Sequence, residues 1–247
     1  MNHIHSHYQQ TLPSELTIYC DEAWRWPLAG PVWVWVIIPH GRVDTSLFQD
    51  SKTLTNNQRI SAYQKICEYA QQSLITYAGW SATAHEIDRY GIIQAIQLAT
   101  LRALAQAFKV YFFTHMRDQL LQSVWWSDHI FVTLIDNLIT WRNDQDVDRV
   151  RWFVVTFVQE PQTLMKFNQL IRDGNHTFGL DVLLWCHVQT IIQGDAKVPL
   201  IWAASIVAKV QRDAYMIAIS KKYSKRWFAA HKWYGTLKHR TFITQSK

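Results

Sequence analysis

Cysteine is scarce in this chain. There are three cysteines among 247 residues, and they lie far apart, at Cys20, Cys67 and Cys186. So small and scattered a set excludes a disulfide-stabilised scaffold and a cysteine-based zinc knuckle. We therefore expect a protein of a reducing compartment and predict a cytoplasmic location.

Long apolar runs are also missing. No stretch approaches the roughly 18 consecutive apolar residues that a membrane-spanning helix needs, so we expect no membrane association. The opening segment, MNHIHSHYQQTLPSE, lacks the apolar core of a signal peptide. We interpret residues 1–15 as a flexible N-terminal tail.

Glycine is rare, whereas tryptophan is unusually frequent. The chain has 8 glycines and 13 tryptophans, although average usage of about 7% would give roughly 17 glycines in a chain of this length. The glycine shortfall is similar in size to the tryptophan excess. No Gly/Ser/Pro-rich linker or internal repeat divides the chain, so a single domain is preferred.

Basic residues outnumber acidic ones, 25 to 19, which gives a net charge of +6. This balance favours a polyanionic partner such as nucleic acid. A basic protein without such a partner is the alternative. With 49% hydrophobic and 18% charged residues, the chain can bury a sizeable core and is not disordered.

Apolar runs and helical spacing alternate along the chain. The runs predict strands over 16–23, 31–39, 73–80, 128–137, 149–158 and 183–192. Helical spacing predicts helices over 55–72, 82–91, 92–112, 161–172 and 201–223, and 194–199 reads as a loop. Strands that come first and then mix with helices indicate an α/β fold with a mixed sheet.

Several acidic residues stand at the ends of these apolar runs. Asp21, Glu22 and Asp136 close predicted strands, and Asp195 follows a short apolar run and a glycine. Carboxylates gathered at one edge of a sheet repel one another unless cations neutralise them. Mg²⁺ or Mn²⁺ suits such oxygen ligands, and two ions about 4 Å apart promote phosphodiester cleavage. The alternative is that these acids are ordinary caps and salt-bridge partners.

Five basic residues could contact the phosphates of a nucleic acid, although each alone is more often a solvated charge. They are Lys52, Lys197, Lys209, Arg212 and Lys232.

The chain also carries an ordered set of motifs. Its first is Asp21 to Val32, DEAWRWPLAGPV. The others are Asp50-Ser51-Lys52-x-Leu54, Glu86-Ile87-Asp88, Leu134-Ile135-Asp136-Asn137, Gly194 to Pro199, Ala203 to Asp213, and Phe228 to Thr236. Together they resemble bacterial ribonuclease HII, whose opening motif is Asp-Glu-x-Gly-Arg-Gly-Pro-Leu-Ala-Gly-Pro-Val. The resemblance covers most of 16–240 except 138–190.

The resemblance implies a ribonuclease H-like fold, in which helices flank a mixed β-sheet and a small helical part follows at the C-terminus. It implies a metal-dependent endoribonuclease that cleaves RNA in RNA/DNA hybrids and single ribonucleotides embedded in duplex DNA, leaving a 3′-hydroxyl and a 5′-phosphate. It also implies a role in DNA repair and replication. A monomer is expected, and a sliding clamp is a conceivable partner for which the sequence shows no clear binding motif.

The resemblance also assigns residues to roles. The catalytic, metal-binding carboxylates are Asp21, Glu22, Asp136 and Asp195. The segment around Arg25 reads the 2′-hydroxyl largely through its backbone, and Tyr234 stacks on the sugar or base beside the junction. The substrate-binding set is Trp24, Arg25, Trp26, Lys52, Lys209, Arg212, Lys232 and Tyr234.

These assignments divide the chain into three parts. Residues 16–223 form the catalytic domain and 224–247 a substrate-binding segment, after the tail at 1–15. Residues 138–190 are interpreted as an insertion that the family lacks.

Two positions depart from the family in a consistent way. Trp24 and Trp26 stand where the family has glycine, which lets backbone approach a ligand closely. Glycine is also expected at Trp227 and Trp233, and small residues around Trp80 and Trp202. Our hypothesis is recoding: a gene that reads UGA as glycine has been translated as if UGA were tryptophan. The alternative is that the tryptophans are real, which would leave a nucleic-acid-binding homologue whose groove is blocked and whose catalysis is impaired.

Overall fold

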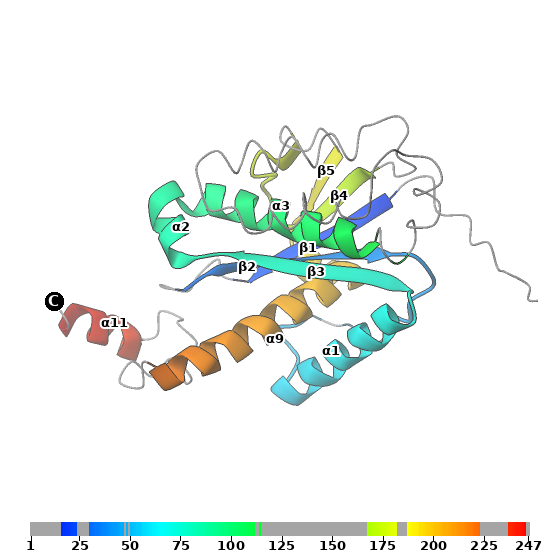
Figure 1. The fold of residues 1–247 in the computed structure, drawn as a ribbon. Coiled ribbons are helices and arrows are strands. Elements are labelled where there is room, and N and C mark those ends of the chain that lie inside the picture. Colours follow the sequence, from blue (N-terminus) through cyan, green and yellow to red (C-terminus); the bar gives the residue numbers. More distant parts are fainter. Residues whose placement is uncertain are drawn as a thin grey trace, which may run out of the picture.

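A five-stranded sheet forms the centre of the part of the chain that the computed structural model describes. That part comprises residues 16–23, 30–46, 48, 50–111, 114, 167–181, 187–222 and 237–245. The strands are β1 (Leu16–Ala23), β2 (Val32–Pro39), β3 (Ile75–Ala82), β4 (Phe167–Asp173) and β5 (His187–Ile191), and they lie in the order β3-β2-β1-β4-β5 (Figure 1).

The sheet is mixed, as predicted. β2 pairs antiparallel with both β1 and β3, whereas β4 lies parallel to β1 and to β5. Because parallel neighbours end at the same edge of a sheet, residues that close β1 and β4 meet there.

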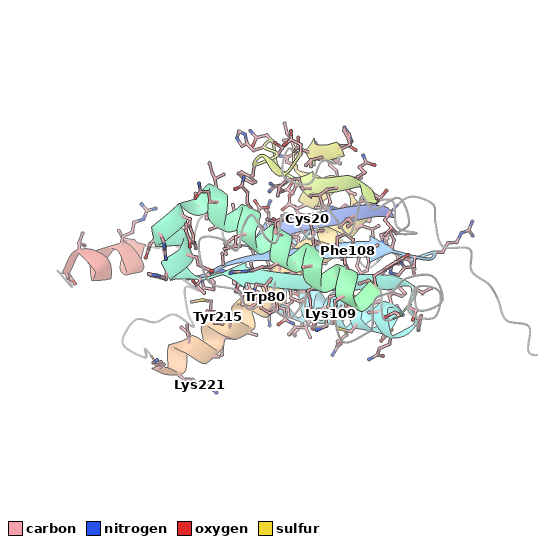
Figure 2. All side chains as sticks on the ribbon, turned by 45° about the horizontal axis from the view of Figure 1, so that its top comes forward. Cys20, Trp80, Phe108, Lys109, Tyr215 and Lys221 are labelled. Carbon is pink, nitrogen blue, oxygen red and sulfur yellow. The ribbon has the colours of Figure 1, made fainter. Side chains whose placement is uncertain are left out.

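Helices cover both faces of the sheet (Figure 1). On one face lies α3 (Ile92–Tyr111), on the other α9 (Pro199–Lys222) and α1 (Asn56–Gln71). The stripe Ala95, Ala99, Ala103 and Ala107 of α3 is fully buried, and small side chains at this spacing let a helix lie close to a sheet. Cys20 of β1 and Phe108 of α3 belong to the core between them (Figure 2). The α/β prediction is confirmed.

Side chains alternate strictly between the two faces. Leu16, Ile18 and Cys20 of β1 belong to the core under α3, so Tyr19 and Asp21 face the side of α9. In β4, Leu170 belongs to the core under α3. Arg172 therefore shares that face, and Asp173 points to the opposite one.

The motif Glu86-Ile87-Asp88 has a structural explanation. α2 (Ala84–Tyr90) begins with a capping box, in which Glu86 Oε2 accepts a hydrogen bond from the Thr83 backbone N at 2.7 Å. The other carboxylate oxygen of Glu86 lies 2.8 Å from Arg102 Nη2 of α3. Glu86 therefore caps α2 and ties it to α3.

Two predictions of secondary structure between residues 161 and 199 are wrong. The predicted helix at 161–172 is a strand over its described part, β4, and the predicted loop at 194–199 contains a short helix, α8 (Gly194–Lys197). β4 and all but the last residue of β5 lie in the range 138–190, interpreted as an insertion, and both are strands of the central sheet. The predicted strands at 128–137 and 149–158 lie outside the described residues. A last helix, α11 (Leu237–Gln245), ends the described chain.

The described residues contain no helix long and apolar enough to cross a membrane.

Trp80 and Trp202 are the two described members of the tryptophans at expected small-residue positions. Trp80 packs against the edge of the core under α3. Trp202 lies half-buried on α9, and its indole Nε1 is buried with no hydrogen-bond partner in the described structure. A buried donor without a partner costs free energy, but Trp33 and Trp35 share this feature, so it does not set position 202 apart.

Candidate active site

The ends of β1 and β4 bring two aspartates together. The parallel register pairs Cys20 with Arg172, so Asp21 and Asp173 are the next residues on the neighbouring strands and share the face under α9. Asp21 is 4% exposed, and the nearby negative charge of Asp173 helps to raise its pKa.

Asp173 also holds the backbone beside Asp195, the last of the four predicted carboxylates. Its Oδ1 accepts hydrogen bonds from the backbone N of Gly194 at 2.6 Å and of Asp195 at 3.3 Å. These contacts hold the first turn of α8 against the end of β4. A Cβ at position 194 would lie 2.8 Å from Ile201 Cδ1 and 3.4 Å from Asp173 Oδ1, so glycine fits this contact without displacing its neighbours. Asp195, itself 4% exposed, therefore lies in the same cluster as Asp21.

Glu22 points to the other face of the sheet, as the alternation requires. Its Oε2 lies 2.7 Å from Nη2 of Arg172, and both side chains are buried, at 8% and 2% exposure.

Lysines from two motifs complete the cluster on the α9 side. Lys52 Nζ lies 2.6 Å from Asp195 Oδ2. Lys209 Nζ donates to Ser205 Oγ at 3.0 Å and also to Ser51. The Asp50-Ser51-Lys52 loop and α9 thus meet beside the acids.

The electrostatics of Asp21 reflect this crowding. Burial raises the pKa of Asp21 well above its usual range, and the charges of Glu22 and Asp173 raise it further. The positive charge of Lys209 and a hydrogen bond with Ser205 act in the opposite direction. Burial lowers the pKa of Lys209, although the nearby charges of Asp21 and Asp195 oppose that shift. The cluster therefore favours any added positive charge that neutralises Asp21.

A hard divalent cation fits this donor set. Within the described residues, no three Asp, Glu, His or Cys side chains form a ready-made metal cage. The described carboxylates are instead held by cations of the chain, Glu22 by Arg172 and Asp195 by Lys52. Carboxylate oxygens are what Mg²⁺ and Mn²⁺ prefer. Burial and then the charges of Glu22 and Asp173 raise the pKa of Asp21, and a cation bound beside it would oppose that shift.

The structure thus brings together Asp21, Glu22 and Asp195, with Lys52 and Lys209 beside them. Arg212 is 2% exposed and lies 3.8 Å from Asp213 Oδ1, so its side chain is not presented to a substrate in this structure. Lys197, another candidate phosphate contact, donates from Nζ to Ile192 O at 2.8 Å. The other candidates lie outside the described residues: Trp24, Arg25, Trp26, Asp136, Lys232 and Tyr234.

Sequence reasoning missed Asp173. A signal was present, because Leu170-Ile171-Arg172-Asp173-Gly174 repeats the family pattern Leu-Ile-Asp-Gly with one arginine inserted. The uninterrupted Leu134-Ile135-Asp136 matched that pattern better and drew the assignment to Asp136.

Comparisons with known proteins give a consistent family. No model of a known protein family matches the chain. Among curated proteins, it is 31% identical to the ribonuclease HII of Treponema denticola over 219 residues, covering 89% of this chain and 86% of that protein. It is 30% identical to the ribonuclease HII of Verminephrobacter eiseniae over 227 residues, covering 92% and 78%.

Solved structures give a more distant likeness. The ribonuclease H2 of Pyrococcus horikoshii is 17% identical, with a TM-score of 0.47 over 94% of this chain and 86% of that one. The ribonuclease HII in the PCNA complex from Archaeoglobus fulgidus is 14% identical, with a TM-score of 0.49 over 93% and 87%. At these values the two structures place no residue of this chain.

The curated relatives, by contrast, are similar over most of both chains. The predicted resemblance is confirmed, and with it the enzyme class, an endoribonuclease. On the identity and coverage of these relatives, the chain belongs to the ribonuclease HII family.

Proposed function

We propose that this protein hydrolyses the RNA strand of RNA/DNA hybrids and cuts at single ribonucleotides embedded in duplex DNA, leaving a 3′-hydroxyl and a 5′-phosphate. The observation that carries the proposal is the convergence of Asp21, Asp173 and Asp195 at one edge of the sheet. In a chain of this family, such a convergence is best explained as a site for two Mg²⁺ or Mn²⁺ ions and a scissile phosphate.

The acids would hold the ions from both faces of the sheet edge. Asp21, Asp173 and Asp195 supply oxygens on the α9 side, and Glu22 supplies them on the other. When bound, the divalent ions supply Lewis-acid activation of water and stabilise the leaving oxygen. We assign the third strand-end carboxylate to Asp173 in place of Asp136, because Asp173 borders Asp21 and binds the backbone of α8.

The two lysines have different tasks. The Lys52 side chain is 65% exposed, so it can turn from Asp195 to a phosphate oxygen when substrate arrives. Lys209 is more buried and is held by Ser205 and Ser51. Its positive charge stabilises the carboxylate of Asp21, and its contacts hold the Ser51 loop against α9.

Substrate choice is assigned to segments outside the described residues. The backbone around Arg25 would recognise the 2′-hydroxyl, the group that distinguishes RNA from DNA. Tyr234 would stack beside the junction, as aromatic rings do at sequence-tolerant sites.

A cleavage assay tests the proposal. The substrate is duplex DNA with one ribonucleotide, in Mg²⁺ or Mn²⁺. Asp21→Asn should lower the cleavage rate by about 10²- to 10³-fold, since loss of a metal ligand removes several kcal/mol of transition-state stabilisation. Asp44→Asn is the matched control, because Asp44 is exposed and follows β2 at the opposite end of the sheet. Equal cleavage by both variants would refute the metal role of Asp21.

The second candidate function is nucleic-acid binding without cleavage, which the bulk of Trp24 and Trp26 favours. The same assay distinguishes it, because the chain would then bind the duplex and leave it intact. The double variant Trp24→Gly/Trp26→Gly should cleave faster than the sequence as printed. Equal or slower cleavage by that variant would contradict our interpretation of the turn.

A further inference from the structure

Arg172 is a buried cation inserted at the acid cluster. It directly precedes Asp173 at the end of β4, and its side chain is 2% exposed. Three contacts fix it. Nη2 lies 2.7 Å from Glu22 Oε2, Nε donates to the Asp173 backbone O at 3.3 Å, and the guanidinium carbon lies 4.2 Å from the centre of the Phe178 ring.

This arrangement is not optimal for stability alone. In the described structure, Nη1 of Arg172 is buried without a hydrogen-bond partner. Burying a guanidinium is unfavourable unless its donors are satisfied, and a buried ion pair often stabilises no more than apolar residues of similar size. What distinguishes Arg172 from other buried arginines of the described structure is its partner, because Glu22 belongs to the candidate metal-binding carboxylates.

The two ion pairs of the cluster differ in how easily they open. The side chain of Lys52, the partner of Asp195, is 65% exposed, so a divalent ion displaces it at little cost. Arg172 has no such route to water, and its ring contact and backbone hydrogen bond hold it in place. Glu22 is consequently the less available of the two carboxylates.

We propose that the Arg172 guanidinium competes with the divalent ion for Glu22, so that the chain binds one ion readily on the α9 side and a second only when Glu22 exchanges Arg172 for metal. The inference rests on the proposed two-ion function and concerns how this chain fills its sites. Its consequence is a weak second ion, which makes the doubly loaded state depend on metal concentration.

Calorimetric titration with MnCl₂ alone, without nucleic acid, tests this exchange. Arg172→Met removes the charge and keeps an unbranched apolar stem. It should tighten the weaker Mn²⁺ binding event about tenfold or more, because one like charge near the ion is removed. Unchanged affinities in Arg172→Met would overturn the proposal.

A matched control separates charge competition from general loosening of the fold. Arg102 is also a buried arginine paired with a glutamate, at 5% exposure, and it lies on α3. Arg102→Met should lower the melting temperature in EDTA and leave both Mn²⁺ affinities as in the wild type. A similar gain of Mn²⁺ affinity in Arg102→Met would also overturn the proposal.

Two further variants keep the test decisive. In a Glu22→Gln background, Arg172→Met should no longer change Mn²⁺ binding, since the carboxylate for which the two cations compete is gone. Arg172→Lys keeps the charge but loses the planar fork of donors, so it should tighten the weaker event by a smaller factor, and it serves if the methionine variant does not fold. Normal Mn²⁺ binding in a chain that cleaves no ribonucleotide substrate would count against the proposed function alone.

Discussion

Two arginine–glutamate pairs of the described structure have nearly the same N–O distance but different surroundings. Arg102 and Glu86 approach to 2.8 Å, and Arg172 and Glu22 to 2.7 Å. Around Glu86, burial would raise the pKa, but hydrogen bonds from Arg102 and Thr83 hold it below its usual value. Around Glu22, the neighbouring Asp21 has a raised pKa. The carboxylate of the first pair is satisfied by Arg102 and Thr83, whereas the second pair lies beside Asp21, whose pKa is raised.

The N–O distance of a buried ion pair therefore does not indicate its role. What differs is whether the neighbours of the pair are satisfied. Glu86 caps a helix with one oxygen and binds Arg102 with the other. The Glu22 pair lies beside Asp21 and Asp173, whose charges repel. Such local frustration is typical of sites whose missing charge arrives with a ligand.

The largest effect is expected from a substitution in the acid cluster on the α9 side. Asp173→Asn should lower cleavage of ribonucleotide-containing duplex DNA by about 10²- to 10³-fold, as expected for a lost metal ligand. Asp136→Asn, made in parallel, decides between the two candidates for the third carboxylate. A large loss in Asp136→Asn with near-normal Asp173→Asn would return the assignment to Asp136.

The second largest effect is expected from a substitution in the Glu86–Arg102 pair. Glu86→Gln should lower the free energy of unfolding by about 3 kcal/mol, because it removes the carboxylate that faces the buried Arg102 guanidinium. Chemical denaturation measures this. The folded-state pKa of Glu86 is depressed, so the contribution of the carboxylate is present above its unfolded pKa and is lost as pH falls through the folded pKa. The destabilisation should therefore shrink in acid. Cleavage by the folded variant should stay within about twofold of wild type, and a loss comparable to that of Asp21→Asn would erase the distinction between the pairs.

Local patterns predicted the elements that carry strong periodicity. The apolar runs of β1 and β2 and the alanine-rich spacing of α3 fix those elements within a residue or two. β4 lies mostly in the range 161–172 that helical spacing predicts as a helix, and FNQLIRD neither alternates nor forms a long apolar run that would indicate a strand. It is a strand because it pairs with β1 on one side and β5 on the other, a tertiary influence that a local pattern cannot contain.

The arrangement of the candidate site follows from the sequence only in part. Asp21, Glu22 and Asp195 follow from strand ends and a resembling motif. Asp173 did not, since Arg172 separates it from the apolar run that would have marked it. Arg172, which made Asp173 hard to find in the sequence, is thus also the residue that pairs with Glu22 in the structure.

The smallest expected effect concerns the stability of the empty cluster. The folded-state pKa of Asp21 is raised, chiefly by burial and then by Glu22 and Asp173. The stability that protonated Asp21 contributes is therefore complete below its unfolded pKa and is lost as pH rises through the folded pKa. At pH 8 in EDTA, Asp21→Asn should melt about 2–4 °C above the wild type, which corresponds to roughly 1 kcal/mol in a chain of this size. The difference should disappear near pH 4.

Metal should reverse this order, because a divalent ion bound to the wild type supplies the charge that the cluster lacks. In millimolar Mn²⁺ at pH 8 the wild type should gain more in melting temperature than Asp21→Asn does. Glu86→Gln should respond to Mn²⁺ as the wild type does, since its carboxylate lies outside the cluster. A wild type that melts above Asp21→Asn in EDTA at pH 8 would mean that Asp21 stabilises the empty fold, and the contrast between a satisfied pair and a frustrated cluster would fail.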